Sequence, residues 1–333
     1  ERAGPLPSAN PAARSAEGRL VSRRAGTLDL PLREGVAAST VAVPAGAWPT
    51  VLDFLAERLP ALSRADWHAR LAGGEVLDEA GQRLDPHAPC PHGRRLHYWR
   101  WHAQEPALPW HETIVFQDEW LVVADKPHFM PVTPSGRFAR QSLLARLRQR
   151  LGLPRLSPVH RIDRDTAGLV LLAVQPHTRD AYQALFRARA VHKHYEAVAA
   201  HRPDLALPRR HASRLEPDPE RFFIGREVPG EPNSVSELAC AQVLGRHALY
   251  HLRSITGQRH QLRLHMAALG RPILGDAFYP EVRHAAGVDD WQRPLQLLAR
   301  ALAFTDPVTG QARAFQSSLQ LAAAQGRWPL AGG

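Results

Sequence analysis

The chain has 333 residues, enough for two or three domains, and 44% of them are apolar, so a sizeable core can form. No apolar run approaches the ~18 to 20 residues that a membrane helix needs, which excludes a membrane span as an organising feature. Cys90 and Cys240 are the only cysteines and lie far apart, which excludes a cysteine zinc site and a disulfide framework and suits a reducing cytoplasm.

The net charge of +10 comes almost entirely from arginine, since Lys126 and Lys193 are the only lysines. An excess of base favours a polyanionic partner, and nucleic acid is the commonest one. A GC-rich genome explains part of the preference for arginine over lysine, but it leaves the excess of base over acid unexplained. His192 and His194 flank Lys193, but no nearby residue completes a metal ligand set, so we expect a polar surface and no metal.

The first part of the chain divides into a tail and a small module. Residues 1–40 are rich in Ala, Arg, Gly, Pro and Ser and have no sustained period, which predicts a disordered basic tail. Within residues 41–101, apolar side chains repeat at helical spacing over 51–59. Ser63-Arg64-Ala65-Asp66 is typical of a capping box, and it predicts a second helix.

Two strands complete this predicted α/β module. Gly73-Gly74 ends the second helix, and strands are expected over 75–77 and 94–100. This order, with Leu62-Ser63-Arg64 opening the second helix, resembles the S4-like RNA-binding domain. The resemblance implies that Arg64 contacts RNA, while a small adaptor domain without an RNA role remains the alternative.

Residues 102–111, with Pro106 and Pro109, are expected to be a linker, and residues 112–333 a larger domain. In this domain the apolar patterns mix strands and helices without a regular alternation. The pattern favours an α+β fold over a doubly wound sheet. The elements expected are strands at 114–116, 120–123, 168–174 and 195–199, and helices around 143–151, 182–186 and 262–269.

The segment with the most chemistry is His160-Arg161-Ile162-Asp163-Arg164-Asp165-Thr166-Ala167-Gly168, which leads into the apolar run of 168–174. A loop at the end of a strand can hold a charged side chain at the edge of a core. From spacing alone, a turn in which Asp163 and Asp165 cap backbone amides is the simpler interpretation.

The same segment resembles the signature of the RluA-type pseudouridine synthase family, usually His-Arg-Leu-Asp-x-x-Thr-Ser-Gly. Three further segments match that family in order and distance. They are Asp125-Lys126-Pro127, Lys193-His194-Tyr195, and Thr256-Gly257-Gln258-Arg259-His260-Gln261-Leu262-Arg263-Leu264-His265 followed by Leu269 to Asp276. The resemblance covers about residues 112 to 305. It implies a mixed, mostly antiparallel sheet of the pseudouridine synthase type, in a chain that is a monomer.

The resemblance also implies roles for particular residues. Asp163 matches the catalytic aspartate, Tyr195 the tyrosine that packs on the target base, and Arg263 the arginine that pairs with the aspartate. Arg161 matches the arginine that helps to hold the base out of the RNA stack, and Leu297 the apolar residue against the base. Two positions depart from the family pattern, at Gln258-Arg259 and at Leu298, and these departures affect RNA contacts rather than the reaction.

The implied reaction explains why these residue types occur together. An ionised carboxylate can act as a nucleophile or a base on uridine, and the first atom attacked, sugar C1′, base C6 or a sugar proton, stays open. A nearby Arg263 would lower the pKa of Asp163 and offset its burial. The face of Tyr195 would stack on a base, and Arg259 with the free amides of its helix would favour a phosphate.

The sequence therefore predicts an enzyme that isomerises uridine to pseudouridine in structured ribosomal RNA or tRNA, without a cofactor or a metal. A non-catalytic RNA-binding or ribosome-assembly factor with the same fold is the alternative. A hydrolase of the same glycosidic bond usually needs two carboxylates at a set separation. Asp165 is the only close second acid, and we expect it to cap a turn with Thr166.

Overall fold

The computed structural model describes residues 30–100, 105–204, 206–283 and 289–328, and these residues group into two compact units. Residues 41–97 form the smaller unit, and residues 32–40 belong with the chain from residue 98 onward. None of the helices in the described ranges is long and apolar enough to cross a membrane.

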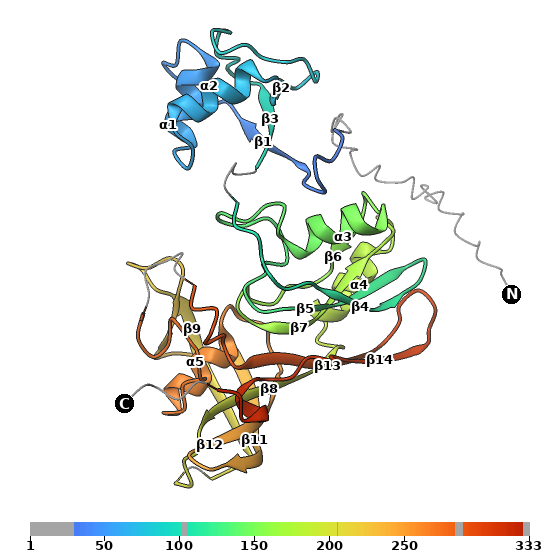
Figure 1. Cartoon of the computed structure of the whole chain (residues 1–333), viewed down its shortest axis with the longest axis vertical. Coiled ribbons are helices and arrows are strands. Elements are labelled where there is room, and N and C mark those ends of the chain that lie inside the picture. Colours follow the sequence, from blue (N-terminus) through green and yellow to red (C-terminus); the bar gives the residue numbers. More distant parts are fainter. Residues whose placement is uncertain (1–29, 101–104, 205, 284–288, 329–333) are drawn as a thin grey trace, which may run out of the picture. The chain divides into compact units, whose positions relative to one another are not determined.

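The smaller unit pairs two helices with a three-stranded sheet in the order β1-β3-β2 (Figure 1). Thr50 and Ser63 begin the two helices with capping boxes, in which each side chain accepts the amide of the aspartate three residues later. Trp67 and Leu71 bury the inner face of the second helix. The elements are β1 (Ala38–Ala42), α1 (Val51–Arg58), α2 (Arg64–Ala72), β2 (Val76–Asp78) and β3 (Arg95–Trp99).

The larger unit is built on a mixed sheet that has 11 strands within the described residues. Its main path runs β10-β9-β11-β12-β8-β13-β7-β5-β4, and every pair is antiparallel except β13 with β7. Strand β6 pairs with β7, and β14 pairs with β13. The α+β fold with a mostly antiparallel sheet is thus confirmed.

The elements of the larger unit follow in chain order. They are β4 (Thr113–Gln117), β5 (Leu121–Lys126), α3 (Leu143–Leu151), β6 (Ser157–Pro158), β7 (Ala167–Ala173), α4 (Arg179–Arg187), β8 (His192–Ala200), β9 (Arg209–Pro217), β10 (Gly225–Val228), β11 (Ser234–Leu244), β12 (His247–Ser254), α5 (Gln261–Ala268), β13 (Leu297–Thr305), β14 (Ala312–Gln316) and a 3₁₀ turn (Ala323–Gln325).

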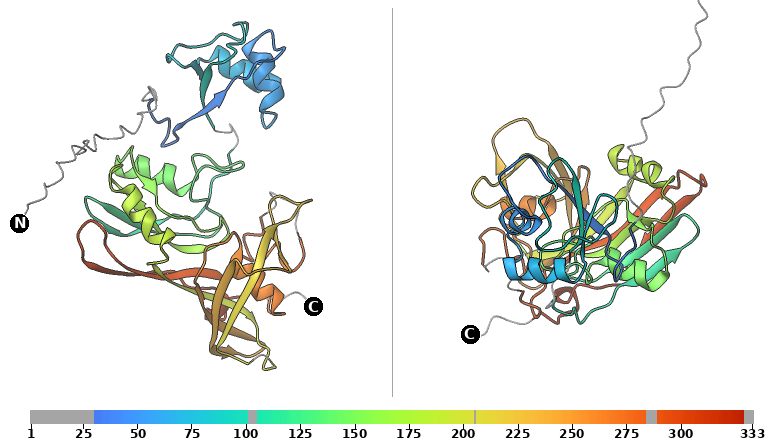
Figure 2. Two further views of the ribbon diagram at one scale, coloured as in Figure 1. Left: turned by 180° about the vertical axis from the view of Figure 1, so that it is seen from behind. Right: turned by 90° about the horizontal axis from the view of Figure 1, so that it is seen from above.

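Helices cover both faces of the sheet around β5 and β7. Because successive side chains of a strand alternate between faces, Val170 and Leu172 pack with α3 while Leu169 and Leu171 pack with Tyr182 of α4. The two helices lie on opposite sides of these strands in the view from above (Figure 2). All seven residues of β7 are buried, so this strand forms the centre of the core.

Helix α5 covers the other half of the sheet. Its Leu262 and Met266 pack on a cluster from β8, β11 and β12 that includes Ala199 and Leu252. Tyr195 of β8 packs against this cluster and also against the cluster under α3. Tyr195 therefore lies where the two halves of the sheet meet.

A glycine allows the parallel contact between the two halves. Gly168 has a φ of +114°, and a Cβ atom there would lie 2.3 Å from the carbonyl oxygen of Ala299. Gly168 pairs with Ala299 as β7 joins β13. A side chain at position 168 would clash with the backbone of β13 and force β7 and β13 apart.

The structure differs from the predicted tail and linker. Residues 1–29 of the tail and 101–104, which include part of the linker, lie outside the described residues. Residues 33–40, however, are ordered by contacts with the larger unit and lead into β1. Arg33 and Val36 form a β-bridge, and Val36 is buried against Ala139 and Ala145. In the linker, Leu108 is buried in the core and Glu105 accepts three backbone amides of residues 139–141.

Candidate active site

A cavity of about 600 Å³ opens where the halves of the large sheet meet. Its walls come from the segment 159–163, from α4, from β8, from residues 254–263 and from the start of β13. This volume lies within the usual range of small-ligand pockets. Asp163 is the only acid among the described residues that line it.

His160 holds the loop that carries Asp163 in place. The Nε2 atom of His160 accepts the backbone amide of Leu171 at 3.0 Å, and its ring stacks on Phe186. Burial lowers the pKa of His160 to about 3, so the ring is neutral and its acceptor nitrogen stays available. The amide of Thr166 then donates to the main-chain oxygen of Asp163, which closes the turn and leaves the Asp163 carboxylate free.

A buried lysine supports the same loop from β5. Lys126 is fully buried, and its Nζ atom donates to the carbonyl oxygens of Pro127 and Arg164. Burial lowers its pKa to about 7, although the charges of Asp165 and Asp163 act in the opposite direction. The carbonyl of residue 164 is thus fixed next to the candidate carboxylate.

Asp165 does not cap the turn as expected. Its carboxylate accepts the Nε atom of Arg164 at 3.0 Å. The same guanidinium reaches Asp289 at 2.6 Å and 3.1 Å. The Asp165 side chain is committed to this ion-pair network and is absent from the cavity wall, which leaves Asp163 without a second acid beside it.

The central cation is Arg263, and it is shared between two carboxylates. Its guanidinium donates to both oxygens of Asp276, at 2.8 Å and 2.7 Å, and its Nη1 atom lies 3.7 Å from Asp163. Burial by itself would lower the pKa of Arg263, but the Asp276 carboxylate raises it above its ordinary value. The ring faces of Phe278 and Tyr279 lie 5.1 Å and 5.4 Å from the guanidinium carbon. Arg263 therefore stays charged at the base of the cavity.

Side-chain bonds shape the turn that precedes α5. The Oε1 atom of Gln261 accepts the Thr256 hydroxyl and the Gln258 amide, while its Nε2 atom donates to Val235 and Ser236. These bonds fix the start of α5 against β11. Arg263, two residues further along the helix, is thereby aimed at the cavity.

His260 lies beside Asp163 in a left-handed conformation with φ +55°. Its Nδ1 atom is 2.8 Å from the hydroxyl of Tyr279, and its Nε2 atom is 3.9 Å from Asp163. Burial, together with the charge of Arg263, lowers the pKa of His260 to about 3. The imidazole is therefore neutral near pH 7 and adds no charge to the pair.

Tyr195 and Leu297 form an apolar wall of the same cavity. Both line the cavity, and Leu297 is 3% exposed. Burial, and then the negative charge of Asp163, raises the pKa of Tyr195 to about 12, and its hydroxyl shares a hydrogen bond with Ser254. The wall presents a neutral phenol and an aliphatic side chain, which suit a flat, uncharged ring.

Comparison with known proteins assigns the chain to one family. The family model for RNA pseudouridylate synthase matches residues 120–268. An RNA pseudouridine synthase of Synechocystis is 30% identical over 237 residues, which cover 69% of this chain and 79% of the relative. The dual-specificity RNA pseudouridine synthase RluA of Salmonella typhi is 32% identical, over 63% of this chain and 94% of the relative. The chain belongs to the RluA-type pseudouridine synthase family.

This pseudouridine synthase is accordingly an isomerase that acts on RNA. The ribosomal large subunit pseudouridine synthase D of Vibrio vulnificus is a further relative, 30% identical over 66% of this chain and 69% of the relative. Among solved structures, human RNA pseudouridylate synthase domain containing 1 superposes with a TM-score of 0.54 at 21% identity. It covers 68% of this chain and 91% of that chain, and it supports the fold alone.

The synthase gathers five of the seven residues predicted from the sequence around one cavity. They are Asp163, Tyr195, Arg263, Arg161 and Leu297. Arg161 is exposed at the rim. Arg263 is 2% exposed, so it lies inside the domain and not on its surface.

The other two residues lie elsewhere. The terminal nitrogens of Arg259 donate to the carbonyl oxygens of Phe222 and Phe223, so its guanidinium is bound to the chain outside the cavity wall, and its phosphate contact stays a prediction. Arg64 belongs to the smaller unit, where it is exposed and forms an ion pair with Asp53 at 2.7 Å.

Sequence reasoning missed three residues of the site, and each carried a signal. Asp276 and His260 stand within the segments that match the family, but their spacing in the sequence did not indicate that they contact Arg263 and Asp163. Lys126 is one of two lysines in an arginine-rich chain, which marks it as unusual. The fold also brings two residues near His194 that the sequence did not place there: one ligand atom each of Glu196 and His251 lies within 4.8 Å of one of His194.

Proposed function

We propose that this synthase converts uridine to pseudouridine in structured ribosomal RNA or tRNA, with Asp163 as its catalytic carboxylate and without a cofactor. The observation that carries the proposal is that Asp163, the sole acid among the described cavity residues, lies 3.7 Å from the buried, charged Arg263. An opposite charge at this distance favours the ionised form of a carboxylate. A hydrolase with two carboxylates would need a second acid in the wall.

The apolar wall supports a seat for the target base. A uridine that is stacked in RNA must leave the stack to reach Asp163, at a cost of a few kcal/mol. Stacking on an aromatic side chain returns roughly 1 to 3 kcal/mol per base. In the proposed complex the base lies against Tyr195 and Leu297, with one ring edge toward Asp163.

The reaction conserves every atom of the nucleoside except for exchanged protons. The bond between N1 and C1′ breaks, the base turns, and C5 forms the new bond to C1′. C5 then loses its proton, and N1 takes up one proton. Asp163 acts on the nucleoside as a nucleophile or base, and Arg263 stabilises its negative charge in the cavity. These steps involve no change of oxidation state.

The rim of the cavity supports RNA as the substrate. Arg161, Arg187, Arg189 and Lys193 line it, and a cationic rim attracts the phosphates on either side of a flipped nucleotide. The names of two relatives support ribosomal RNA or tRNA as the substrate, since one is a ribosomal large subunit synthase and the other a dual-specificity RNA synthase. We further propose that the synthase works in the cytoplasm as a monomer.

We propose that residues 41–101 are an S4-like RNA-binding domain, distinct from the catalytic domain of 112–333. The helix-helix-strand order and the exposed Arg64 support this role. Deletion of residues 41–101 is expected to weaken RNA binding while the chemistry survives. An unchanged affinity for the cognate RNA would refute the role.

The decisive experiment measures tritium release from RNA labelled at uridine C5. Wild type is expected to release tritium from RNA of cells that lack the gene, and Asp163→Asn, which keeps the side-chain shape, is expected to release none. Asp165→Asn is the matched control, because it removes the neighbouring carboxylate outside the cavity. Equal release by wild type and Asp163→Asn would overturn the assignment. Absence of release by wild type together with tight RNA binding would favour the non-catalytic factor.

A further inference from the structure

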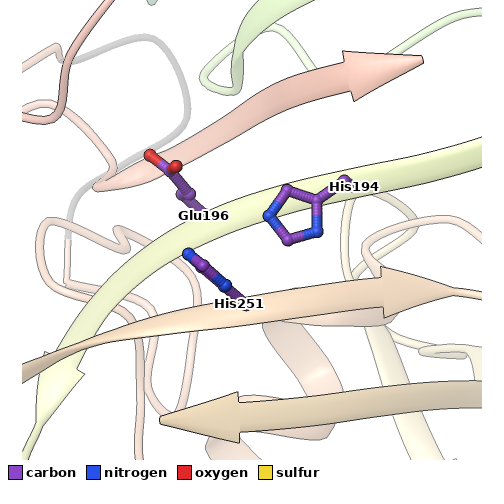
Figure 3. Close-up of side chains that lie close together, drawn as sticks. All are labelled: His194, Glu196 and His251. Carbon is purple, nitrogen blue, oxygen red and sulfur yellow. The ribbon is translucent and has the colours of Figure 1, made fainter. Parts of the chain in front are cut away.

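A cluster of three side chains lies on strands β8 and β12, apart from the cavity. His194 and Glu196 are two residues apart on β8 and so face the same side of the sheet, and His251 of β12 is paired directly with Glu196. One ligand atom from each of the three lies within 4.8 Å of the others. Figure 3 shows the two imidazole rings and the carboxylate gathered over the two adjacent strands.

The ring nitrogens of this cluster are available. Within the described residues, neither His194 nor His251 has a hydrogen bond to its ring, and the two rings meet edge to face with centroids 4.6 Å apart. A neutral imidazole with a free lone pair is the form that binds a metal.

A second cluster of the same composition shows the contrast. His211, Glu227 and His265 also lie within 4.8 Å by their ligand atoms. The Nε2 atom of His265 is bonded to the hydroxyls of Ser213 and Ser234, and its Nδ1 atom to that of Ser236. His211 is itself bonded to Glu227 at 3.1 Å. The chain satisfies the nitrogens of His265, so this cluster has no ligand set to offer.

The first cluster also has access and a fixed carboxylate. A cavity of about 390 Å³ borders both His194 and His251. Arg300 holds one oxygen of Glu196 at 2.6 Å and is itself fixed by the carbonyls of Ser317 and Leu319. Such an outer contact orients a ligating carboxylate and leaves its other oxygen for an ion, while the positive charge of Arg300 moderates the affinity.

We propose that His194, Glu196 and His251 bind one divalent transition-metal ion of the Zn²⁺ or Co²⁺ type, with water completing the coordination. Two imidazoles and one carboxylate suit these ions, whereas Mg²⁺ and Ca²⁺ prefer oxygen ligands throughout. This metal site is separate from the site of isomerisation. Tyr195 stands between the two β8 ligands in the sequence, so its side chain faces the opposite side of the sheet. The ion links β8, which carries Tyr195, to β12, which ends at Ser254, and so has a structural role.

The test uses the full chain without a histidine tag, freed of metal by a chelator. Titration with Co²⁺ is followed by visible absorption, and Zn²⁺ binding by calorimetry. Wild type is expected to bind one ion per chain, and His194→Asn and His251→Asn are expected to weaken binding at least ~10-fold. His211→Asn, in the second cluster, is the matched control and is expected to bind as wild type does.

The thermal unfolding midpoint gives an independent measurement. Zn²⁺ is expected to raise the midpoint of wild type and of His211→Asn, but not that of His251→Asn. Tritium release by the metal-free variants shows that they are folded, since none of these histidines contacts the base in the proposed complex. Absence of saturable binding to wild type would overturn the proposal. Binding that survives both His194→Asn and His251→Asn, or that is lost in His211→Asn, would overturn it as well.

Discussion

The pair of Arg263 and Asp276 allows a sharp test of how the cavity is held together. Asp276→Asn removes the charge that faces Arg263 but keeps the side-chain shape and an oxygen for the backbone amides of Phe278 and Tyr279. The side chains of Arg263 and Asp276 are 2% and 1% exposed. Loss of one partner from a buried ion pair leaves an uncompensated charge and costs about 3 to 5 kcal/mol.

For a domain of this size, 1 kcal/mol corresponds to roughly 2 to 4 °C in the unfolding midpoint, so a fall of about 6 to 20 °C is expected. Activity is expected to fall too. The freed guanidinium is 3.7 Å from Asp163 and would bind it directly, which withdraws the carboxylate from the nucleoside. Thermal unfolding gives the midpoint, and tritium release at a temperature well below it gives kcat.

The matched control is Asp180→Asn. Asp180 forms an ion pair with Arg187 at 2.8 Å, but its side chain is 84% exposed. Exposed pairs contribute about 0 to 1 kcal/mol, so the midpoint should change by no more than a few degrees. If Asp276→Asn behaved like this control in both midpoint and kcat, the idea that Asp276 positions Arg263 would be refuted.

Three further predictions concern other parts of the site. Tyr195→Phe is expected to keep base stacking and to lower kcat more than it raises KM. Tyr195→Ala should also raise KM about 5- to 150-fold, because stacking on the base is lost. Equal KM values for the two variants would contradict the stacking role. Burial lowers the pKa of Lys126 from 10.5 to about 7, so the unfolded chain binds more protons between those pH values and stability should rise with pH across them. Lys126→Met should flatten that rise in urea unfolding, and an unchanged slope would exclude Lys126 as its source. Gly168→Ala places a Cβ atom 2.3 Å from the Ala299 carbonyl and should destabilise the synthase by more than about 4 kcal/mol, a prediction that a urea midpoint close to wild type would contradict.

The parts of the fold that the sequence predicts are those set by local interactions. The capping box at Ser63 and Asp66 lies within four residues, and the helix starts where that pattern places it. The apolar run that follows Gly168 forms the buried strand β7, because its length and continuity suit a strand covered on both faces. The helix of 143–151 also lies where its apolar spacing predicts it.

The parts that the sequence does not predict depend on contacts between distant segments. Strands β9 to β12 carry many polar and charged residues, and no strand was predicted in 209–254. His194 and His251 are brought together only by the register of β8 against β12. Lys126 is in a strand of which both faces are covered, a fact that no local pattern expresses.

The geometry of Arg263 also bears on why Asp163 can react. A guanidinium that made two short bonds to Asp163 would engage both oxygens of the carboxylate and hold them away from a substrate. Here Asp276 takes that bidentate contact, and Asp163 keeps a longer contact of 3.7 Å with its side chain 28% exposed to the cavity. Charge attraction falls only in proportion to distance, so the longer contact keeps much of the stabilisation while the hydrogen bonds go elsewhere. In the proposed mechanism, the buried carboxylate of Asp276 fixes the guanidinium of Arg263, and the exposed carboxylate of Asp163 stays available to attack the nucleoside.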